Sequence, residues 1–273
     1  MLYGTVIAVD RPAPNLVRVV MGGEGLARFE PNGFTDAYVN VAIPPVGAPY
    51  RAPFDLDEVG ARFGPEQRPH RRRYTVRRWN AAVRELTLEF VVHGDEGVGG
   101  SWAASAAPGD VLVFTGPGGG YRPDGEVGLH LLVGDESALP AIAASLEALR
   151  PTARAIVRIV VDGPRHEVAL ASPARMDLRW LHRTGDTAED ERLLVDTVAD
   201  LTLPDPTLPG SRVQAFVHGE AAEVRAIRRH LLVERGMPRA DLSCSPYWRR
   251  HLTDEVWRER KPAWTAELER DVA

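Results

Sequence analysis

Apolar and polar residues alternate along several short stretches in the first part of the chain, which is the pattern of half-buried β-strands. In residues 85–93 the alternation is regular, with Leu86, Leu88, Phe90 and Val92 on one side. The expected strands are residues 5–9, 16–21, 37–43, 70–78, 85–93 and 111–115, separated by proline and glycine. Together they predict a small antiparallel barrel. Residues 44–70 show no clear period and are expected to form a long loop.

Beyond residue 128 the apolar residues form nearly unbroken runs, which is typical of strands in a parallel sheet that is buried on both faces. The expected strands are residues 129–133, 155–161, 175–181, 214–217 and 242–245, and the expected helices are residues 141–149, 189–199 and 221–235. Alternating strands and helices predict a parallel α/β domain. We expect domains at 1–126 and 127–273, the second ending in a largely helical tail. In the helix at 221–235, Arg225, Arg228 and Arg229 are expected on a solvated face.

The composition excludes several classes of protein. The net charge of -5 over 273 residues argues against general nucleic-acid binding, which requires a basic surface. The single cysteine, Cys244, excludes an internal disulfide and is expected to be a core residue. No stretch approaches the roughly 18 apolar residues of a membrane span, and the first residues do not begin a signal peptide. We therefore expect a cytoplasmic protein with no membrane partner.

The stretch at 70–78 is the main candidate for ligand binding. It holds five arginines around Tyr74, which Thr75 follows. A flat aromatic ring beside fixed positive charge and a hydroxyl group suits a ligand with a planar ring and a phosphate tail, such as a flavin nucleotide. The alternative is a solvated basic edge strand, in which arginines discourage pairing with another strand.

Two turns that contain glycine are candidates for phosphate contacts. Gly97, Gly99 and Gly100 come just before a short helix expected at 102–106. Glycines before a helix let backbone N–H groups approach a pyrophosphate closely, although a plain flexible loop is the alternative. The second turn, at 134–140, follows a buried strand and faces the carboxyl end of the predicted sheet. It lacks the G-x-G-x-x-G spacing of the usual dinucleotide fingerprint.

Taken in order, four stretches resemble the siderophore-interacting protein family, the FAD-dependent ferric-siderophore reductases. They are residues 72–77 (RRYTVR), residues 92–103, residues 134–142 (GDESALPAI), and residues 219–220 with 228–229 and 247–250 (YWRR). The resemblance covers almost the whole chain, and its specificity lies in the combination and order of the stretches. It implies a β + α/β, ferredoxin-reductase-like architecture. An N-terminal antiparallel FAD-binding β-barrel would precede a parallel α/β NAD(P)H-binding domain with a helical C-terminal tail.

The resemblance also implies a role for individual residues. Arg72 would contact the phosphate of the flavin nucleotide, Tyr74 its ring and Thr75 its ribityl chain or phosphate, with Val76 beside them. The residues that would enclose the pyrophosphate and adenosine are His93, Gly99, Gly100, Ser101, Trp102 and Ala103. Those that would border NAD(P)H are Asp135, Glu136, Ser137 and Ala138. Tyr247 and Trp248 would lie near the flavin or the nicotinamide.

The activity implied by the resemblance is electron transfer from NADH or NADPH through FAD to iron(III) in a ferric siderophore, with release of iron(II). No protein residue is expected to act as a catalyst or a metal ligand, because no His/Cys/Asp cluster has ligand spacing. The candidates for binding the anionic chelate are Arg51, Arg122, Arg249 and Lys261. The protein is expected to be a monomer. A flavin oxidoreductase with another acceptor and a non-catalytic siderophore-binding protein are the alternatives.

Two positions depart from the family pattern. Gly118 stands where the loop after Thr115 often has an arginine, and Pro246 stands where a glycine usually precedes Tyr-Trp-Arg. Both departures bear on the substrate more than on the flavin. The residues also leave the nucleotide open, because Arg158, Arg165 or Arg183 could meet the 2′-phosphate of NADPH.

Overall fold

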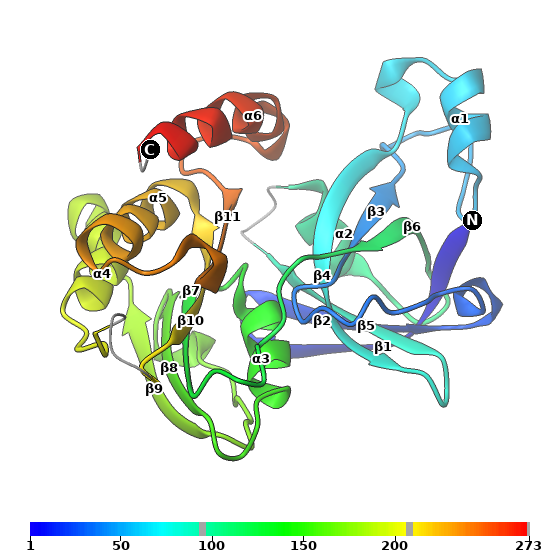
Figure 1. Ribbon diagram of the computed structural model, residues 1–273. Helices are drawn as coiled ribbons and strands as arrows, with labels where there is room; N and C mark the ends of the chain where they lie inside the picture. The colour runs from blue at the N-terminus through cyan, green and yellow to red at the C-terminus, as the bar shows by residue number, and fades with distance from the viewer. Residues whose placement is uncertain (93–96, 206–209, 272–273) are drawn as a thin grey trace. The chain divides into compact units, whose positions relative to one another are not determined.

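The computed structural model describes residues 1–92, 97–205 and 210–271 (Figure 1). They form two compact units, Met1–Gly120 and Tyr121–Ala273, each with a hydrophobic core of its own. Within the described ranges, the helices are all too short or too polar to cross a membrane.

The first unit is a closed barrel of six strands in the order β1-β2-β5-β4-β3-β6, and every neighbouring pair is antiparallel. The strands are β1 (Leu2–Ala13), β2 (Leu16–Gly22), β3 (Tyr38–Ile43), β4 (His70–Asn80), β5 (Glu85–Val91) and β6 (Val111–Gly118). A short helix, α2 (Val98–Ser105), follows β5. The predicted small antiparallel barrel is confirmed.

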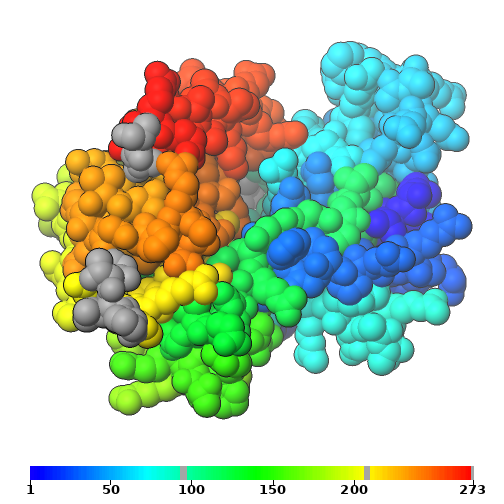
Figure 2. All heavy atoms as spheres, viewed as in Figure 1, coloured from blue at the N-terminus to red at the C-terminus, as the bar shows by residue number. Residues whose placement is uncertain are grey.

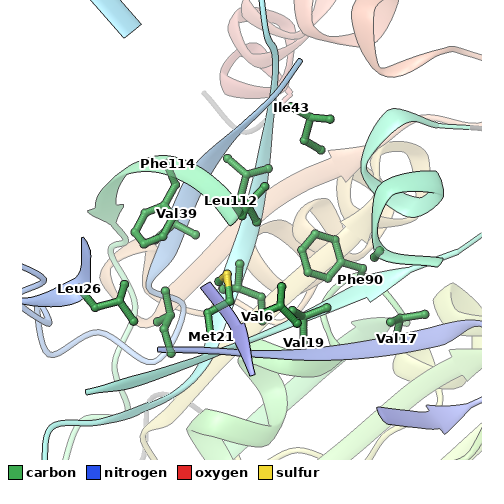
Figure 3. Close-up of a cluster of buried hydrophobic side chains, with 14 of the residues drawn as sticks. Val6, Val17, Val19, Met21, Leu26, Val39, Ile43, Phe90, Leu112 and Phe114 are labelled. Atoms are coloured by element: carbon green, nitrogen blue, oxygen red, sulfur yellow. The ribbon is translucent and has the colours of Figure 1, made fainter. Parts of the chain in front are cut away.

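The barrel core is built from the alternating apolar positions of these strands. Leu86, Leu88 and Phe90 of β5 are fully buried in it, as the alternation in the sequence predicts. In Figure 3 the side chain of Phe90 points toward the interior of the cluster, which also contains Leu112 and Phe114 of β6. Successive side chains on a strand point to opposite faces, so the polar residues between these positions lie outside the core.

The prediction that residues 44–70 form only a loop is wrong, because the segment contains helix α1 (Leu56–Arg62). Asp55 is the N-cap, and its carboxylate accepts hydrogen bonds from the backbone N–H groups of Asp57 (2.9 Å) and Glu58 (3.1 Å). A small apolar cluster with Phe54 and Val59 at its centre anchors the helix. The capping aspartate was the available signal for this helix.

The second unit contains a five-stranded parallel sheet in the order β11-β10-β7-β8-β9, so the predicted parallel α/β fold is confirmed. The strands are β7 (Leu129–Asp135), β8 (Arg154–Val161), β9 (Arg175–His182), β10 (Val213–Glu220) and β11 (Leu242–Trp248). The helices are α3 (Leu139–Glu147), α4 (Thr187–Ala199), α5 (Ala221–Arg229) and α6 (Asp254–Arg270). The strand order reverses between β7 and β10, which is where open α/β sheets form a ligand crevice.

Helices cover both faces of this sheet (Figure 1). On one face, Val133 and Val217 pack against Leu194 of α4 and Ile227 of α5. Gly134 points to the other face, where α3 approaches closely. A Cβ atom at this glycine would lie only 2.6 Å from the Cβ atom of Ala138.

The expectation that Arg225, Arg228 and Arg229 form a solvated face is wrong for Arg228, and Arg225 is half-exposed. Arg228 is buried and donates to the carbonyl oxygen of Leu268 (2.8 Å) and to Glu269 (2.9 Å). Arg225 donates two hydrogen bonds to Asp271. Both arginines therefore fasten the C-terminal helix α6 to α5. The atoms of α6, red in Figure 2, lie directly against the orange segment that contains α5.

Candidate functional site

Strand β4 carries the arginine-tyrosine stretch along the barrel wall. The Tyr74 ring is half-buried and packs on Phe90, with 4.1 Å between ring centroids. Thr75 is buried, and Val76 packs against the barrel core. Arg72 is half-buried and donates to the carbonyl oxygen of the preceding residue (3.0 Å). Since Tyr74 and Val76 pack on the core, the strand is part of the barrel wall and not a fully solvated edge.

The N-terminus of α2 meets this strand at Tyr74. A Cβ atom added to Gly99 would overlap the Tyr74 hydroxyl group, and one added to Gly100 would lie 3.2 Å from the carbonyl oxygen of Val91. Only glycine permits such a close approach between helix and strand. The sequence places these two stretches 25 residues apart by number, and the fold brings them into contact.

The start of α2 has the chemistry of an anion site. Its N-cap residue, Gly97, has φ 86°, and no side chain of the described residues caps the helix. A Cβ atom at Gly97 would meet no atom of the described residues within 4 Å. Unpaired N–H groups in the first turn and the positive end of the helix dipole attract phosphate groups. The residues present therefore fit the diphosphate of FAD, with Arg72 and Tyr74 on the adjoining strand.

The other predicted residues of this stretch are distributed differently. Ser101 is exposed, Trp102 packs on Phe90, with 5.5 Å between ring centroids, and Ala103 lies inside the barrel core. His93 lies outside the described residues. Gly99 and Gly100 are thus the predicted residues closest to the helix start, whereas Ala103 holds the helix on the barrel.

In the second unit, Asp135 ties the ends of three strands together. One carboxylate oxygen, Oδ1, accepts from the backbone N–H (2.8 Å) and hydroxyl (2.5 Å) of Ser137. The other, Oδ2, accepts from the backbone N–H of Glu220 (3.0 Å) and from the indole of Trp248 (2.7 Å). The side chain is buried, so Asp135 fixes the turn and joins the GDES stretch to the YWRR stretch.

Glu136, the next residue, faces a different partner. Its carboxylate accepts two hydrogen bonds from Arg183, at 2.5 and 2.9 Å, and the same guanidinium donates to Asp162 at 2.7 Å. Burial raises the pKa of Glu136, and the hydrogen bonds from Arg183 oppose the rise. Burial also works to lower the pKa of Arg183, but Glu136 outweighs it and the pKa is raised. Glu136 therefore belongs to a buried ion pair and not to an open helix terminus.

Two further buried carboxylates lie at the end of β10, and sequence patterns did not single them out as site residues. Glu220 caps α5 by accepting from the N–H groups of Ala222 (2.5 Å) and Glu223 (3.1 Å). Glu223 accepts from Arg250 at 2.6 Å. Burial, together with the negative charge of Asp135, raises the pKa of Glu223 to about 8. An acidic residue between an apolar run and the first residue of the expected helix at 221–235 was the signal for Glu220.

Tyr247 lies beside a buried histidine. The His218 ring stacks on Phe216, with 3.7 Å between centroids, and meets Tyr247 edge-on at 5.1 Å. Its Nε2 atom lies 3.0 Å from the hydroxyl of Ser243, and its Nδ1 atom is buried without a hydrogen-bond partner in the described structure. Burial, aided by the charge of Lys261, lowers the pKa of His218 to about 3, so this ring is neutral.

The chelate-binding candidates are divided between the two units, and the three in the second unit do not all lie together. Arg51 is exposed and belongs to the first unit. The carbonyl oxygen of Arg122 accepts a hydrogen bond from the side chain of Gln214, which lies near the start of β10. Arg249 lies 3.6 Å from Glu220, and Lys261 donates to the carbonyl oxygen of Pro246 at 2.6 Å, both beyond the opposite end of that sheet. Arg249 and Lys261 are therefore the only two of the four that share one edge.

Among the residues with described positions, no group of three or more His, Cys, Asp or Glu side chains is arranged to hold a metal ion. Cys244 packs against the core of the second unit, and burial raises the pKa of its thiol to about 12. A thiol in this protonated state is a poor metal ligand and a poor nucleophile.

A barrel with an uncapped helix at the arginine-tyrosine strand, followed by a parallel α/β unit, defines a ferredoxin-reductase-like fold. The ferredoxin reductase of carbazole 1,9a-dioxygenase shares this fold, with a TM-score of 0.61 at 15% identity over 90% of this chain and 69% of that chain. The chain belongs to the siderophore-interacting protein family. The siderophore-interacting FAD-binding domain matches residues 5–121, and the siderophore-interacting protein domain matches residues 127–251.

Several relatives are similar over nearly their whole length. An uncharacterized protein of Mycobacterium tuberculosis is 41% identical over 96% of this chain and 94% of its own length. Ferric vibriobactin reductase ViuB of Vibrio cholerae is 32% identical, covering 90% and 89%. The NADPH-dependent ferric-chelate reductase of Escherichia coli is 30% identical, covering 89% and 91%. The crystal structure of a siderophore utilization protein from T. fusca is 35% identical, with a TM-score of 0.78 over 92% of this chain and 94% of that chain.

Proposed function

We propose that the protein is an FAD-dependent ferric-siderophore reductase. Electrons would pass from NADH or NADPH through the flavin to iron(III) in a bound siderophore, and iron(II) would be released. The observation that carries the proposal is the contact between Tyr74 and Gly99 at the start of α2, where no side chain of the described residues caps the helix. The names of the Vibrio cholerae and Escherichia coli relatives support the choice of a ferric chelate as acceptor.

The residues of the first unit would hold the cofactor. Arg72 and the first-turn N–H groups of α2 would bind the diphosphate, Tyr74 would lie against the ring, and Thr75 would contact the ribityl chain or phosphate. When bound, FAD supplies the conversion of a two-electron donor into one-electron steps, and the protein supplies orientation and a dry environment.

The residues of the second unit would position the nucleotide. Asp135 keeps the turn before α3 rigid through its four hydrogen bonds, and Ser137 and Ala138 follow it at the edge of the sheet. Tyr247 and Trp248 would lie near the nicotinamide or the flavin. No protein side chain needs to ligate iron, because the chelate holds it, and iron(II) is bound less tightly than iron(III) by hard oxygen donors.

The chelate is expected to be anionic, and cationic side chains would hold it. Arg249 and Lys261, which share one edge of the sheet, are the better pair, while Arg51 and Arg122 stay single candidates. We further propose that the protein acts as a cytoplasmic monomer on this small-molecule partner.

The test is anaerobic reduction of the FAD-loaded protein by NADH and by NADPH, followed by mixing with ferric siderophores in the presence of a ferrous-iron trap. We expect the flavin to be reduced and then reoxidised as the ferrous complex appears. Reoxidation by free flavin or ferredoxin, but not by ferric siderophores, would identify another acceptor. A protein that takes up no FAD would contradict the proposal as a whole.

A further inference from the structure

Three charged residues directly follow three neighbouring strands of the sheet in the second unit. Glu136 comes after β7, Asp162 after β8 and Arg183 after β9. The three strands are parallel and paired in register up to their last residues, so all three side chains lie at the carboxyl edge. This is the edge at which doubly wound sheets bind nucleotides.

Arg183 links the two carboxylates into one network. Its Nη1 atom donates to Glu136 at 2.5 Å and to Asp162 at 2.7 Å, and its Nη2 atom donates to Glu136 at 2.9 Å. Two carboxylates and one guanidinium give the network a formal charge of -1. The Glu136 and Arg183 side chains are only 6% and 17% exposed, whereas Asp162 is 45% exposed. Asp162 is therefore the group that the network presents to a ligand.

One carboxylate oxygen of Asp162 is available to accept a hydrogen bond from a ligand. Its Oδ1 atom is used by Arg183, and no described residue donates to its Oδ2 atom. In doubly wound folds an acidic side chain near this position accepts a hydrogen bond from the adenosine ribose 2′-hydroxyl of NAD, while an arginine accommodates the 2′-phosphate of NADP. We propose that Asp162 binds the ribose 2′-hydroxyl and makes NADH, not NADPH, the preferred electron donor. This inference rests on the proposed reductase function.

Neither Arg183 nor Arg158 is free to bind the 2′-phosphate of NADPH beside Asp162. Arg183 cannot turn toward a phosphate without leaving the buried carboxylate of Glu136 unpaired, which is strongly unfavourable. Arg158 is buried, and it donates to the backbone of Val157 and Asp177 and to the Asp177 carboxylate. A 2′-phosphate dianion beside Asp162 would add like charge to a network that is already negative.

Arg165 is the remaining cation near the end of β8. It is exposed, lies three residues after Asp162, and makes no hydrogen bond with the described part of the chain. Of the three arginines considered, Arg165 is thus the one that could rescue NADPH binding, and it serves as the first control.

The test measures affinity separately from turnover. Calorimetric titration of the FAD-loaded protein with NAD⁺ and NADP⁺ is expected to show NAD⁺ binding roughly tenfold or more tightly, the range of one hydrogen bond to a charged group. In Asp162→Asn, this preference should fall to about threefold or less. Arg165→Ala should keep the preference. Asp196→Asn, which makes the same charge change at an exposed carboxylate on α4, should also keep it.

Anaerobic flavin reduction by NADH and NADPH gives the second readout. Equal or tighter binding of NADP⁺ by the unmodified protein, a preference unchanged in Asp162→Asn, or a selective loss of NADP⁺ binding in Arg165→Ala would overturn the inference alone. If neither nucleotide binds and neither reduces the flavin, the proposed electron donor is wrong, and the inference fails with it. The melting temperature of Asp162→Asn, whose side chain is half-exposed, checks that the variant is folded.

Discussion

The turn before α2 and the turn before α3 both join a β-strand to a helix through glycine, yet they differ in what lies inside them. The described part of the α2 turn offers no capping side chain, and its N-cap glycine has open space beside it. The α3 turn encloses a carboxylate of its own, Asp135, which bonds the backbone of Ser137 and Glu220. The described residues at the start of α2 can receive an anion, whereas the α3 turn already contains one.

This difference separates two kinds of nucleotide contact. A diphosphate is stabilised by unpaired N–H groups at a helix start. Beside Asp135 and Glu136 the same diphosphate would meet like charge, so hydroxyl groups are the better ligands at that edge. A glycine between a strand and a helix therefore does not by itself identify a phosphate site. The side chains packed into the turn determine whether a phosphate can bind there.

The largest predicted effect is the loss of the internal carboxylate in Asp135→Ala. The change leaves the indole N–H of Trp248 and two backbone N–H groups without their acceptor in a buried place. We expect the free energy of unfolding of the second unit to fall by about 3–5 kcal/mol. Chemical denaturation followed by tryptophan fluorescence measures this change. Ser137→Ala, which loses only the hydroxyl contact to Asp135, should cost about 1 kcal/mol.

The same variant sharpens the contrast between the turns. FAD affinity of folded Asp135→Ala should stay within about twofold of the unmodified protein, because the flavin site is built on the first unit. An FAD affinity that falls with the stability of the second unit would show that the two turns do not act independently.

The next largest effect is expected in Gly99→Val. The new side chain would overlap the Tyr74 hydroxyl, so the start of α2 must move away from β4. Overpacking of this kind costs about 1–3 kcal/mol, and a cost at the upper end corresponds to roughly a hundredfold loss of FAD affinity. Fluorescence titration of the apoprotein with FAD measures it. Ala104→Val, which adds bulk at an exposed position of the same helix outside the assigned site, is the control, and equal affinities in both variants would contradict the assigned site.

Acid is predicted to destabilise the second unit through His218. Its pKa is about 3 in the folded protein and about 6.5 when unfolded, so the unfolded state binds the extra proton between these values. Stability is therefore full above about pH 6.5 and falls as the pH drops, by roughly 2 kcal/mol at pH 5. Melting temperatures of the unmodified protein and His218→Phe between pH 5 and 8 test this.

Glu223 changes the stability with pH in the opposite direction to His218. The unmodified protein is therefore compared with His218→Phe, which also contains Glu223. Its pKa of about 8 is raised, so its contribution to stability is present at low pH and is lost as the pH rises from about 4.5 to 8. That slope is common to both proteins, so it cancels in the difference. A difference that does not grow toward pH 5 would contradict a neutral, buried His218.

The elements that sequence patterns predicted are those that depend on local periodicity. The alternation in β5 and the apolar run of β7 survive folding because each strand's surroundings follow from its own pattern. Arg228 was misplaced because its partners in α6 lie 40 and 41 residues away, where helical periodicity carries no information. The pairing of Glu136 with Arg183 is non-local for the same reason. Helix α1 was missed although its signal was local, because proline and glycine around it outweighed the capping Asp55.

The smallest effect, and the most specific to the α2 turn, is expected from Tyr74→Phe. Removing the hydroxyl should weaken FAD binding by only about threefold, since a single neutral hydrogen bond contributes about 1 kcal/mol or less. The same change should partly relieve Gly99→Ala, because the hydroxyl is the first atom that the new methyl group meets. The ring carbon next to it would still lie 2.8 Å away, so relief should be incomplete.

A double-mutant cycle on FAD affinity therefore tests whether the contact between Tyr74 and Gly99 contributes to FAD binding. Tyr74→Phe with Gly99→Ala should lose less affinity than the sum of the single changes, with an interaction energy of about 0.5–1 kcal/mol. Tyr74→Phe with Ala104→Val should be additive, because Ala104 is exposed on the same helix and lies outside the assigned site. Strict additivity in both pairs would mean that Tyr74 and Gly99 do not meet when the flavin is bound, and the α2 turn would then have to open before the diphosphate enters.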